Sequence, residues 1–301
     1  MNRLTASLVI PTYNRSDVLR ETIERAIEQD YPGLEILVVD QTASHPAALE
    51  QFLTSEHSAF RYLRLPKPSV TAARNVGIRQ TRGDVLVFVD DDVRIEPDFV
   101  RSIVSDFDAP AVGGVMGLLC AAGPSSEAES LAEATRMMLA AAPIKADSVV
   151  EVEWLSNSAV AYRRKVLLDA GLFDEYFIRS AWCEDADMSV RVHALGYRLL
   201  LDARLPVSHL YWRHGGCGNR EPGREEEIEQ DHMDFFHYFI LKNRKFFGSR
   251  KVVRSLYQQY RRYVLNRSTM ARGLQDLWRR HRRFGQSLAA AMRNVPPRQA
   301  A

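Results

Sequence analysis

Short apolar segments alternate with helical patterns along the first third of the chain, and this alternation restricts the fold more than any other feature. Four runs rich in Val, Ile and Leu predict strands, at Ser7–Ile10, Glu35–Val39, Tyr62–Leu65 and Val85–Val89. Because apolar residues occupy both faces of these runs, the strands are expected in a parallel sheet covered by helices on both sides. The alternation therefore predicts right-handed βαβ units and a doubly wound α/β sheet.

Other segments complete the expected fold. A helix is predicted after Ser16, a residue type that favours the N-cap position, because Leu19, Ile23 and Ile27 follow at helical spacing. The remaining expected elements are helices at about 70–80, 97–107 and within 120–147, strands at Glu151–Tyr162, Leu199–Leu201 and Val207–Leu210, a helix at Asp185–Leu195, a loop at His214–Arg224, and further helices to about 292.

Polar residues follow three of the predicted strands directly. They are Pro11–Arg15 after the first strand, Asp40–Gln41 after the second, and Asp90–Asp92 after the fourth. In an open α/β sheet, ligands bind outside the carboxyl ends of the strands, so these groups should converge on one edge. Three adjacent carboxylates repel one another, and clustered oxygen ligands suit a hard cation such as Mg²⁺ or Mn²⁺. A solvated acidic turn is the alternative for the Asp triplet taken alone.

A second acidic group lies about ninety residues further along the chain. Glu184 and Asp185 open a predicted helix, where acidic residues also complement the helix dipole without any catalytic part. Trp182 beside them suits either an acceptor platform or a core position. His209 closes a predicted strand and could bind a metal through its neutral imidazole, although a lone histidine is more often structural.

Six ordered segments together resemble a known family. They are VIPTYNR, QDYPGLEILVVDQ, AARNVGI, RGDVLVFVDDDV, AGLFDE and CEDADMSVRVHALGYR, and they span about residues 5–210. In this combination the chain closely resembles the inverting family 2 glycosyltransferases, which use nucleotide sugars. The resemblance implies the GT-A fold, a Rossmann-like and mostly parallel sheet with an acceptor-side subdomain. The last ninety residues lie outside it and are expected to form a helical extension.

The resemblance also implies roles for individual residues. The implied nucleotide-binding residues are Pro11, Tyr13, Arg15, Asp40, Gln41, Arg74, Asn75, Asp90 and Asp91. Asp90, Asp92 and His209 would hold Mg²⁺ or Mn²⁺, Asp185 would be the catalytic base, and Trp182 and Glu184 would lie on the acceptor side. The family often has a second Asp where this chain has Gln41, whose amide offers one acceptor and one donor edge to a base. UDP and dTDP sugars are therefore favoured as donors, ahead of GDP sugars.

The charge of the chain is divided unequally. From Lys242 onward there are sixteen Lys/Arg and one acidic residue, a net charge of +15, whereas residues 1–241 carry 24 Lys/Arg and 37 Asp/Glu, a net charge of −13. Aromatic and aliphatic residues are interspersed among the basic ones, which suits an anionic membrane surface. The alternative is a helical pack that docks on the acidic body. Nucleic acid is not expected as a partner, because no recognised binding motif accompanies the charge.

These observations predict a single-sugar transferase with three functional parts. Residues 1–110 are expected to bind the nucleotide sugar, 111–215 to hold the acceptor and the base, and 216–301 to form a loop and the basic helical extension. The acceptor would be a hydroxyl of a saccharide, lipid-linked molecule or small molecule in polysaccharide or glycoconjugate synthesis. Three cysteines without CxxC spacing and the lack of an apolar signal core favour a cytoplasmic location, including the inner face of the membrane.

Two other classes compete with this interpretation. A sugar nucleotidyltransferase would have a Gly-rich, basic loop after the first strand, but the loop here is PTYNRSD. A non-catalytic carbohydrate-binding or scaffold protein would not need the intact set of Asp90, Asp92, Asp185 and His209. Processive synthases of the same family carry membrane-spanning helices and a Gln-x-x-Arg-Trp motif, and this sequence has neither.

Overall fold

The computed structural model describes residues 4–55, 59–121, 147–210, 214–216 and 223–296. The chain divides into two compact units. The first, the sheet unit, contains Met1–Arg179 and Glu184–Glu221, and the second, the helical unit, contains Ser180–Cys183 and Pro222–Ala301. The predicted functional division at residues 110 and 215 differs from this division into compact units, since strands from both sides of residue 110 share one sheet. The functional division stays a prediction.

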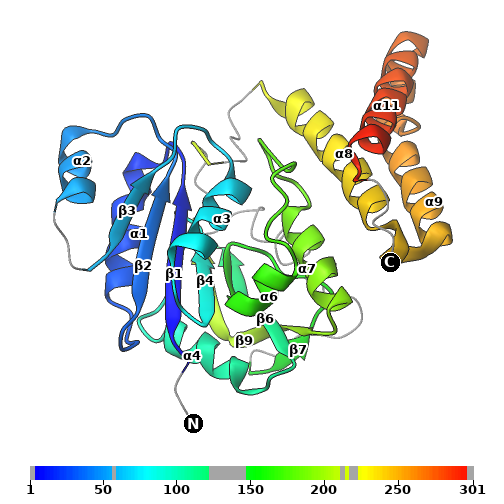
Figure 1. The fold of residues 1–301 in the computed structure, drawn as a ribbon. Coiled ribbons are helices and arrows are strands. Elements are labelled where there is room, and N and C mark those ends of the chain that lie inside the picture. The colour runs from blue at the N-terminus through cyan, green and yellow to red at the C-terminus, as the bar shows by residue number, and fades with distance from the viewer. Residues whose placement is uncertain (1–3, 56–58, 122–146, 211–213, 217–222, 297–301) are drawn as a thin grey trace. The chain divides into compact units, whose positions relative to one another are not determined.

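The described residues of the sheet unit form one sheet of nine strands, and Figure 1 shows the first four of them, which are parallel, side by side. In chain order the nine strands are β1 (Ala6–Thr12), β2 (Glu35–Asp40), β3 (Arg61–Arg64), β4 (Val85–Val89), β5 (Val93–Arg94), β6 (Val112–Ala121), β7 (Val149–Glu151), β8 (Ala159–Arg163) and β9 (Arg198–His209). Their spatial order is β3-β2-β1-β4-β8-β6-β9-β5, and β7 pairs with β9. The first four strands are mutually parallel, as the two-sided apolar runs predict, and β1 and β4 are fully buried.

The second half of the sheet is mixed. Strand β8 runs antiparallel to both β4 and β6, and β9 runs parallel to β6 but antiparallel to β5 and β7. Helices α1 (Ser16–Ile27), α2 (Ala47–Thr54), α3 (Val70–Gln80), α4 (Phe99–Ser105), α6 (Arg164–Asp169) and α7 (Glu184–Ala194) complete the sheet unit. This is the predicted α/β class, with antiparallel pairs that the sequence pattern did not predict.

Three local predictions were wrong. Ser16 is the first residue of α1 and not its N-cap, because its hydroxyl lies 2.8 Å from His45 Nδ1 instead of capping the helix. The expected strands at 199–201 and 207–210 are one strand, β9, since a shift in its pairing with β6 absorbs the residues between Asp202 and Pro206. The expected strand at 151–162 is two short strands, β7 and β8. The helix expected within 120–147 and most of the loop at 214–224 lie outside the described residues.

The helical unit contains α8 (Glu225–Lys242), α9 (Arg244–Tyr263), α10 (Arg267–Ala271) and α11 (Leu274–Asn294). Met233, Tyr263, Val264 and Phe284 form its core. Helix α9 bends at Gly248, whose φ of 74° is outside the helical region. Among the described residues, no helix is long and apolar enough to cross a membrane.

His237, on α8, lies in the interior of the helical unit with no exposed surface. Its Nδ1 is 2.8 Å from Ser287 Oγ on α11, and its ring contacts Phe284 edge-on. Burial lowers the pKa of His237 to about 4, because the charged ring would lose its hydration.

This burial predicts a pH-dependent stability. A histidine with a lowered pKa binds fewer protons in the folded state than in the unfolded state, so its contribution is complete above the unfolded pKa of 6.5 and is lost as the pH falls toward 4. Urea denaturation should show a loss of about 2 kcal/mol between roughly pH 7.5 and pH 5 from this group. His237→Gln, which keeps a partner for Ser287 but cannot titrate there, should remove that part of the slope. An unchanged slope in this variant would contradict the assignment.

Candidate active site

The carboxyl ends of three parallel strands meet at one edge of the sheet. Strand β1 lies between β2 and β4, and its last residue, Thr12, is in register with Asp40, the last residue of β2. Asp90 follows β4 directly, and its amide donates to the carbonyl of Ser158 just before β8. The three polar segments that follow these strands in sequence are thus brought together, as the topology predicts.

Arg15 fixes the inner part of the Asp triplet. Its Nη1 lies 2.5 Å from Asp92 Oδ2 and 3.7 Å from Asp91 Oδ1, and all three side chains are largely buried. The Thr12 hydroxyl donates to Asp91 Oδ2 at 2.6 Å, and the Thr22 hydroxyl donates to the Asp91 carbonyl. Burial raises the pKa of Asp91 to about 7. Asp91 therefore lies in the interior, where it binds Thr12 at the end of β1 and Arg15 in the loop that follows.

Arg74, on α3, joins the triplet to the second acidic group. Its Nη1 is 2.5 Å from Glu184 Oε1 and its Nη2 is 3.2 Å from Asp90 Oδ1. The other Glu184 oxygen accepts from Asn157 Nδ2 at 3.0 Å. Burial raises the pKa of Glu184 to about 7, although Arg74 and Asn157 oppose this shift. Glu184 thus lies inside the protein, held by two side chains.

Asp185 differs from the other carboxylates at this edge. It lies in the first turn of α7, where its Oδ1 accepts from the amide of Ala186 at 2.7 Å. Its hydrogen bonds come from backbone amides at the start of its own helix, and no arginine in the described ranges of the chain forms an ion pair with it. Burial, with repulsion from Asp90, raises the pKa of Asp185 above its ordinary value.

Three predicted metal ligands lie together. One ligand atom each of Asp90, Asp92 and His209 can be chosen so that all lie within 4.8 Å of one another. The end of β9 brings His209 here, because His209 pairs with Val93 of β5 and the amide of Leu210 donates to the Asp92 carbonyl. The His209 Nε2 is 3.8 Å from Asp92 Oδ1. Two carboxylates and an imidazole form a donor set that fits Mg²⁺ or Mn²⁺.

Five carboxyl groups lie at this edge, those of Asp90, Asp91, Asp92, Glu184 and Asp185. Arg15 and Arg74 form ion pairs with four of them.

Asp40 and Gln41 have partners that restrict what they can offer a ligand. The Asp40 carboxylate is fully buried and accepts from Tyr62 Oη at 2.6 Å and from the amide of Thr42, and it lies 2.7 Å from His45 Nε2. These hydrogen bonds outweigh burial and lower the pKa of Asp40. The Gln41 amide group donates both hydrogens, to the carbonyls of Lys67 and Ser69. Only Gln41 Oε1 is left for a ligand, so the expected donor edge is already used.

The other predicted residues occupy different positions. Pro11 is buried in β1, and Tyr13 is half-buried in the loop after it. Asn75 is buried on α3 and clamps the segment after α6, through bonds to the backbone of Phe173 and to Glu175. Trp182 belongs to the helical unit, where its ring stacks on that of His232 on α8, with 4.2 Å between the ring centroids.

Two kinds of contact at this edge of the sheet were not predicted from the sequence. Asn157 connects Glu184 to Tyr162, but a single Asn in a polar stretch carries no recognisable signal. Gly215 and Gly216 pack against the loop after β1, and the Gly216 amide donates to the Tyr13 carbonyl. A Cβ atom on Gly216 would lie 2.5 Å from Arg15 Nη2. The pair of adjacent glycines was the sequence signal that could have indicated this contact. Both residues have positive φ, a conformation that glycine adopts readily.

Replacing Gly216 should disturb Arg15. Gly216 has a φ of +70° and Gly33 a φ of +72°, but only Gly216 has neighbours where a Cβ would be added. Gly216→Ala and Gly33→Ala should each lose about 1 kcal/mol of stability from the backbone conformation. Gly216→Ala alone should also displace the Arg15 guanidinium from Asp92, and so lose about 1–3 kcal/mol of stability more than Gly33→Ala. Urea denaturation of the two variants measures this, and equal losses would contradict it.

Comparison with known proteins identifies the family. The model of glycosyl transferase family 2 matches residues 7–168, more than half of the 301 residues. The chain therefore belongs to glycosyl transferase family 2. The predicted family is confirmed, and the names of the relatives support the predicted enzyme class.

Individual relatives carry related names. The chain is 37% identical over 121 residues to an N-acetylglucosaminyltransferase of Azorhizobium caulinodans, covering 38% of this chain and 30% of that protein. It is 24% identical over 229 residues to the amylovoran biosynthesis glycosyltransferase AmsB of Erwinia amylovora, covering 71% of this chain and 73% of that protein. The chain spans less than half the length of several relatives that it matches.

Solved structures show the same fold. TarS 1–349 of S. aureus, in complex with UDP-GlcNAc, aligns with a TM-score of 0.65 at 17% identity, over 97% of this chain and 82% of that one. The mannosyltransferase PcManGT of Pyrobaculum calidifontis, in complex with GDP-Man and Mn²⁺, aligns with a TM-score of 0.58 at 16% identity, over 99% and 77%. The GT-A fold is therefore confirmed, and these neighbours bind nucleotide sugars, one of them with Mn²⁺.

Proposed function

We propose that the protein transfers a single sugar from a nucleotide diphosphate sugar to an acceptor hydroxyl with inversion, and that Asp185 is the general base. The observation that carries this proposal is the difference in pairing among the carboxylates. Glu184 and Asp91 are held by neighbouring side chains, whereas Asp185, among the residues that the structure describes, accepts hydrogen bonds from backbone amides alone at the start of α7. A carboxylate with a raised pKa and no ion-pair partner is suited to accept a proton.

In the proposed reaction, Asp185 removes the proton of the acceptor hydroxyl as its oxygen attacks the anomeric carbon. The bond between the sugar and the phosphate breaks on the opposite face, and the nucleoside diphosphate leaves with that electron pair. One displacement of this kind inverts the configuration and needs no second carboxylate as a nucleophile. Arg15 and Arg74 hold Asp90, Asp91, Asp92 and Glu184 in place, so that these groups are positioned before the donor binds.

A divalent cation is part of the proposal. Asp90, Asp92 and His209 would hold Mg²⁺ or Mn²⁺, whose charge offsets that of the diphosphate as the leaving group departs. PcManGT, which has the same fold, was solved with Mn²⁺. Asp91 and Asp40 would support the nucleotide pocket indirectly, through Thr12 and Arg15 in one case and Tyr62 and His45 in the other.

The contacts of Gln41 bear on the donor base. Because both amide hydrogens are used, Gln41 offers an acceptor alone. The imide N–H of uracil or thymine is a single donor that fits this acceptor. We therefore favour UDP and dTDP sugars, and guanine, which also presents donors, is the second choice.

The acceptor side and the setting are the least specified parts of the proposal. Trp182 and Glu184 flank the start of α7, with Trp182 as an acceptor contact and Glu184 as a support held by Arg74. The name of AmsB, a relative in amylovoran biosynthesis, favours polysaccharide or glycoconjugate synthesis. Residues 242–301 would contact an anionic membrane surface, which suits a lipid-linked acceptor.

Asp185→Asn should separate catalysis from donor binding. The amide cannot take a proton, so transfer should fall by about 10²–10⁴-fold, while UDP affinity should stay nearly unchanged. In the unmodified protein, transfer should decline as the pH falls through the raised pKa of Asp185, because the protonated acid cannot act as a base. Asp108→Asn, at an exposed carboxylate, is the control. An equal loss of UDP affinity in Asp185→Asn would count against the assignment.

His209→Gln should change the dependence on metal. Loss of one ligand should raise the Mn²⁺ concentration needed for half-maximal UDP binding by at least about tenfold, since even outer-shell changes have effects of this size. His214→Gln, at an exposed histidine of the sheet unit, should leave the Mn²⁺ requirement unchanged. The same titrations with dTDP and GDP rank the bases. Binding of UDP that does not respond to chelation would refute the metal site.

A further inference from the structure

The acidic and basic residues of the helical unit are sorted between its helices. Helix α8 has six acidic residues and one lysine, α9 has seven basic residues and no acidic one, and α11 has five arginines and a single, buried Asp276. Glu226 and Glu229 of α8 form ion pairs with Arg279, Arg280 and Arg283 of α11. The acidic partners of these three arginines therefore lie on α8 and, for Arg279 and Arg280, also at Asp276 of α11.

Other basic residues of the unit lack such a complement. Arg250, Arg254 and Arg261 on α9 and Arg282 on α11 are exposed, and none of them forms an ion pair within the described part of the chain. Three of them lie on one face of α9, since positions 250, 254 and 261 are spaced by four and seven residues. Val253 and Tyr257 share that face and are 66% and 59% exposed.

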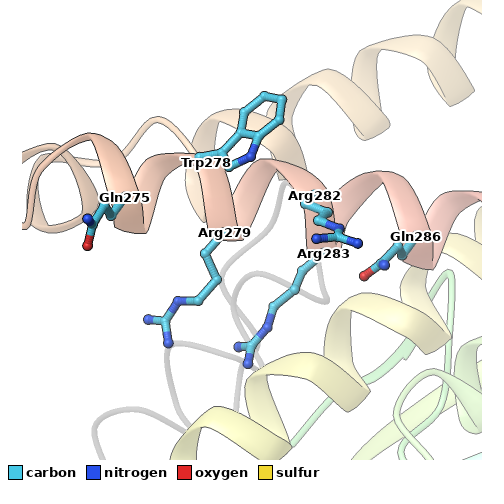
Figure 2. A pocket seen from close by; sticks show the side chains of 6 residues that line it. All are labelled: Gln275, Trp278, Arg279, Arg282, Arg283 and Gln286. Carbon is cyan, nitrogen blue, oxygen red and sulfur yellow. The ribbon is translucent and has the colours of Figure 1, made fainter.

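The exposed side of α11 has the same composition. Leu274, Trp278 and Arg282 are spaced by four residues, and Leu274 and Trp278 are 82% and 68% exposed. Gln275, Arg279, Arg283 and Gln286 line a pocket of about 360 Å³ together with Trp278 and Arg282 (Figure 2). In Figure 2, the side chains of Arg279 and Arg283 extend to the opposite side of the helix from the Trp278 ring.

A chain of aromatic contacts connects the two helices. The Trp278 ring stacks on His281 with 5.5 Å between centroids, and His281 Nδ1 lies 3.0 Å from the Tyr260 hydroxyl of α9. Tyr260 lies one turn from Tyr257 on α9 and also packs against Phe284 in the interior. The exposed residues of α9 and α11 are thus contiguous, and we call Arg250, Val253, Arg254, Tyr257, Arg261, Leu274, Trp278 and Arg282 the outer face.

We propose that the outer face docks on an anionic lipid bilayer, with α9 and α11 lying in the plane of the interface. Tyr and Trp are suited to the headgroup level, where the ring is buried and the polar edge stays hydrated. The four unpaired arginines of the outer face would bind lipid phosphates. Charge complementarity selects this partner, because an uncharged apolar partner would leave four exposed guanidinium groups uncompensated.

Vesicle co-sedimentation of the full chain tests the proposal. Binding to vesicles of phosphatidylcholine with about 30% phosphatidylglycerol should be strong, and binding to phosphatidylcholine alone should be weak. Each removed arginine should weaken partitioning by about fivefold, so that R250Q/R254Q/R261Q/R282Q should lower it by roughly two orders of magnitude or more. Tyr257→Ser with Trp278→Ser should also reduce it, whereas Leu168→Ser, at an exposed leucine of the sheet unit, should not.

The vesicle experiment has outcomes that support the docking of the outer face on lipid and outcomes that contradict it. Loss of binding in the outer-face variants, with unchanged thermal unfolding and unchanged UDP affinity, supports the proposal independently of the transfer reaction. Four results would overturn it: no preference for anionic vesicles, equal binding by the arginine variant and the unmodified chain, a lipid-free dimer that Trp278→Ser dissociates, or tight binding to RNA without binding to vesicles.

Discussion

Two buried arginines hold together the parts of the active site that come from distant segments. Arg15 binds Asp91 and Asp92, and Arg74 binds Asp90 and Glu184. Without them, adjacent carboxylates at the end of β4 and at the start of α7 would repel one another in a poorly hydrated region. Asp185 forms no ion pair within the described part of the chain, and burial together with repulsion from Asp90 raises its pKa. The site depends on the pairing with the two arginines more than on any single carboxylate.

The fold was largely predictable from local patterns. Apolar runs such as VLVFV in β4 carry their own signal, because a strand buried on both faces must be apolar at every position. The convergence of Thr12–Arg15, Asp40–Gln41 and Asp90–Asp92 followed from topology. Strand β9 was misjudged because Pro206 and the polar residues before it resemble a strand end, whereas the shift in register accommodates them.

Side-chain partners within the site were not predictable. The position of a residue in the sequence shows at which strand end it lies, but it does not show in which direction its side chain points or what it bonds to. Asp40 is in the expected place, yet Tyr62 and His45 occupy its oxygens, and Gln41 has already donated both amide hydrogens. These pairs join residues up to about thirty positions apart, and Asn157 and Glu184 are equally remote from any local motif. Such contacts depend on packing that only the folded chain defines.

The contacts of Gly216 have a consequence for the order in which the protein is made. The loop after β1 is among the first segments to be synthesised, and Gly216, which packs on it, follows two hundred residues later. His209 and Glu184 also come late in the chain. Because domains fold as the chain emerges from its N-terminus, the early strands can pair well before the loop at residues 13–15 has its partner. A nascent chain that ends before residue 216 would thus have the strands of this sheet edge without the glycine that packs on Arg15.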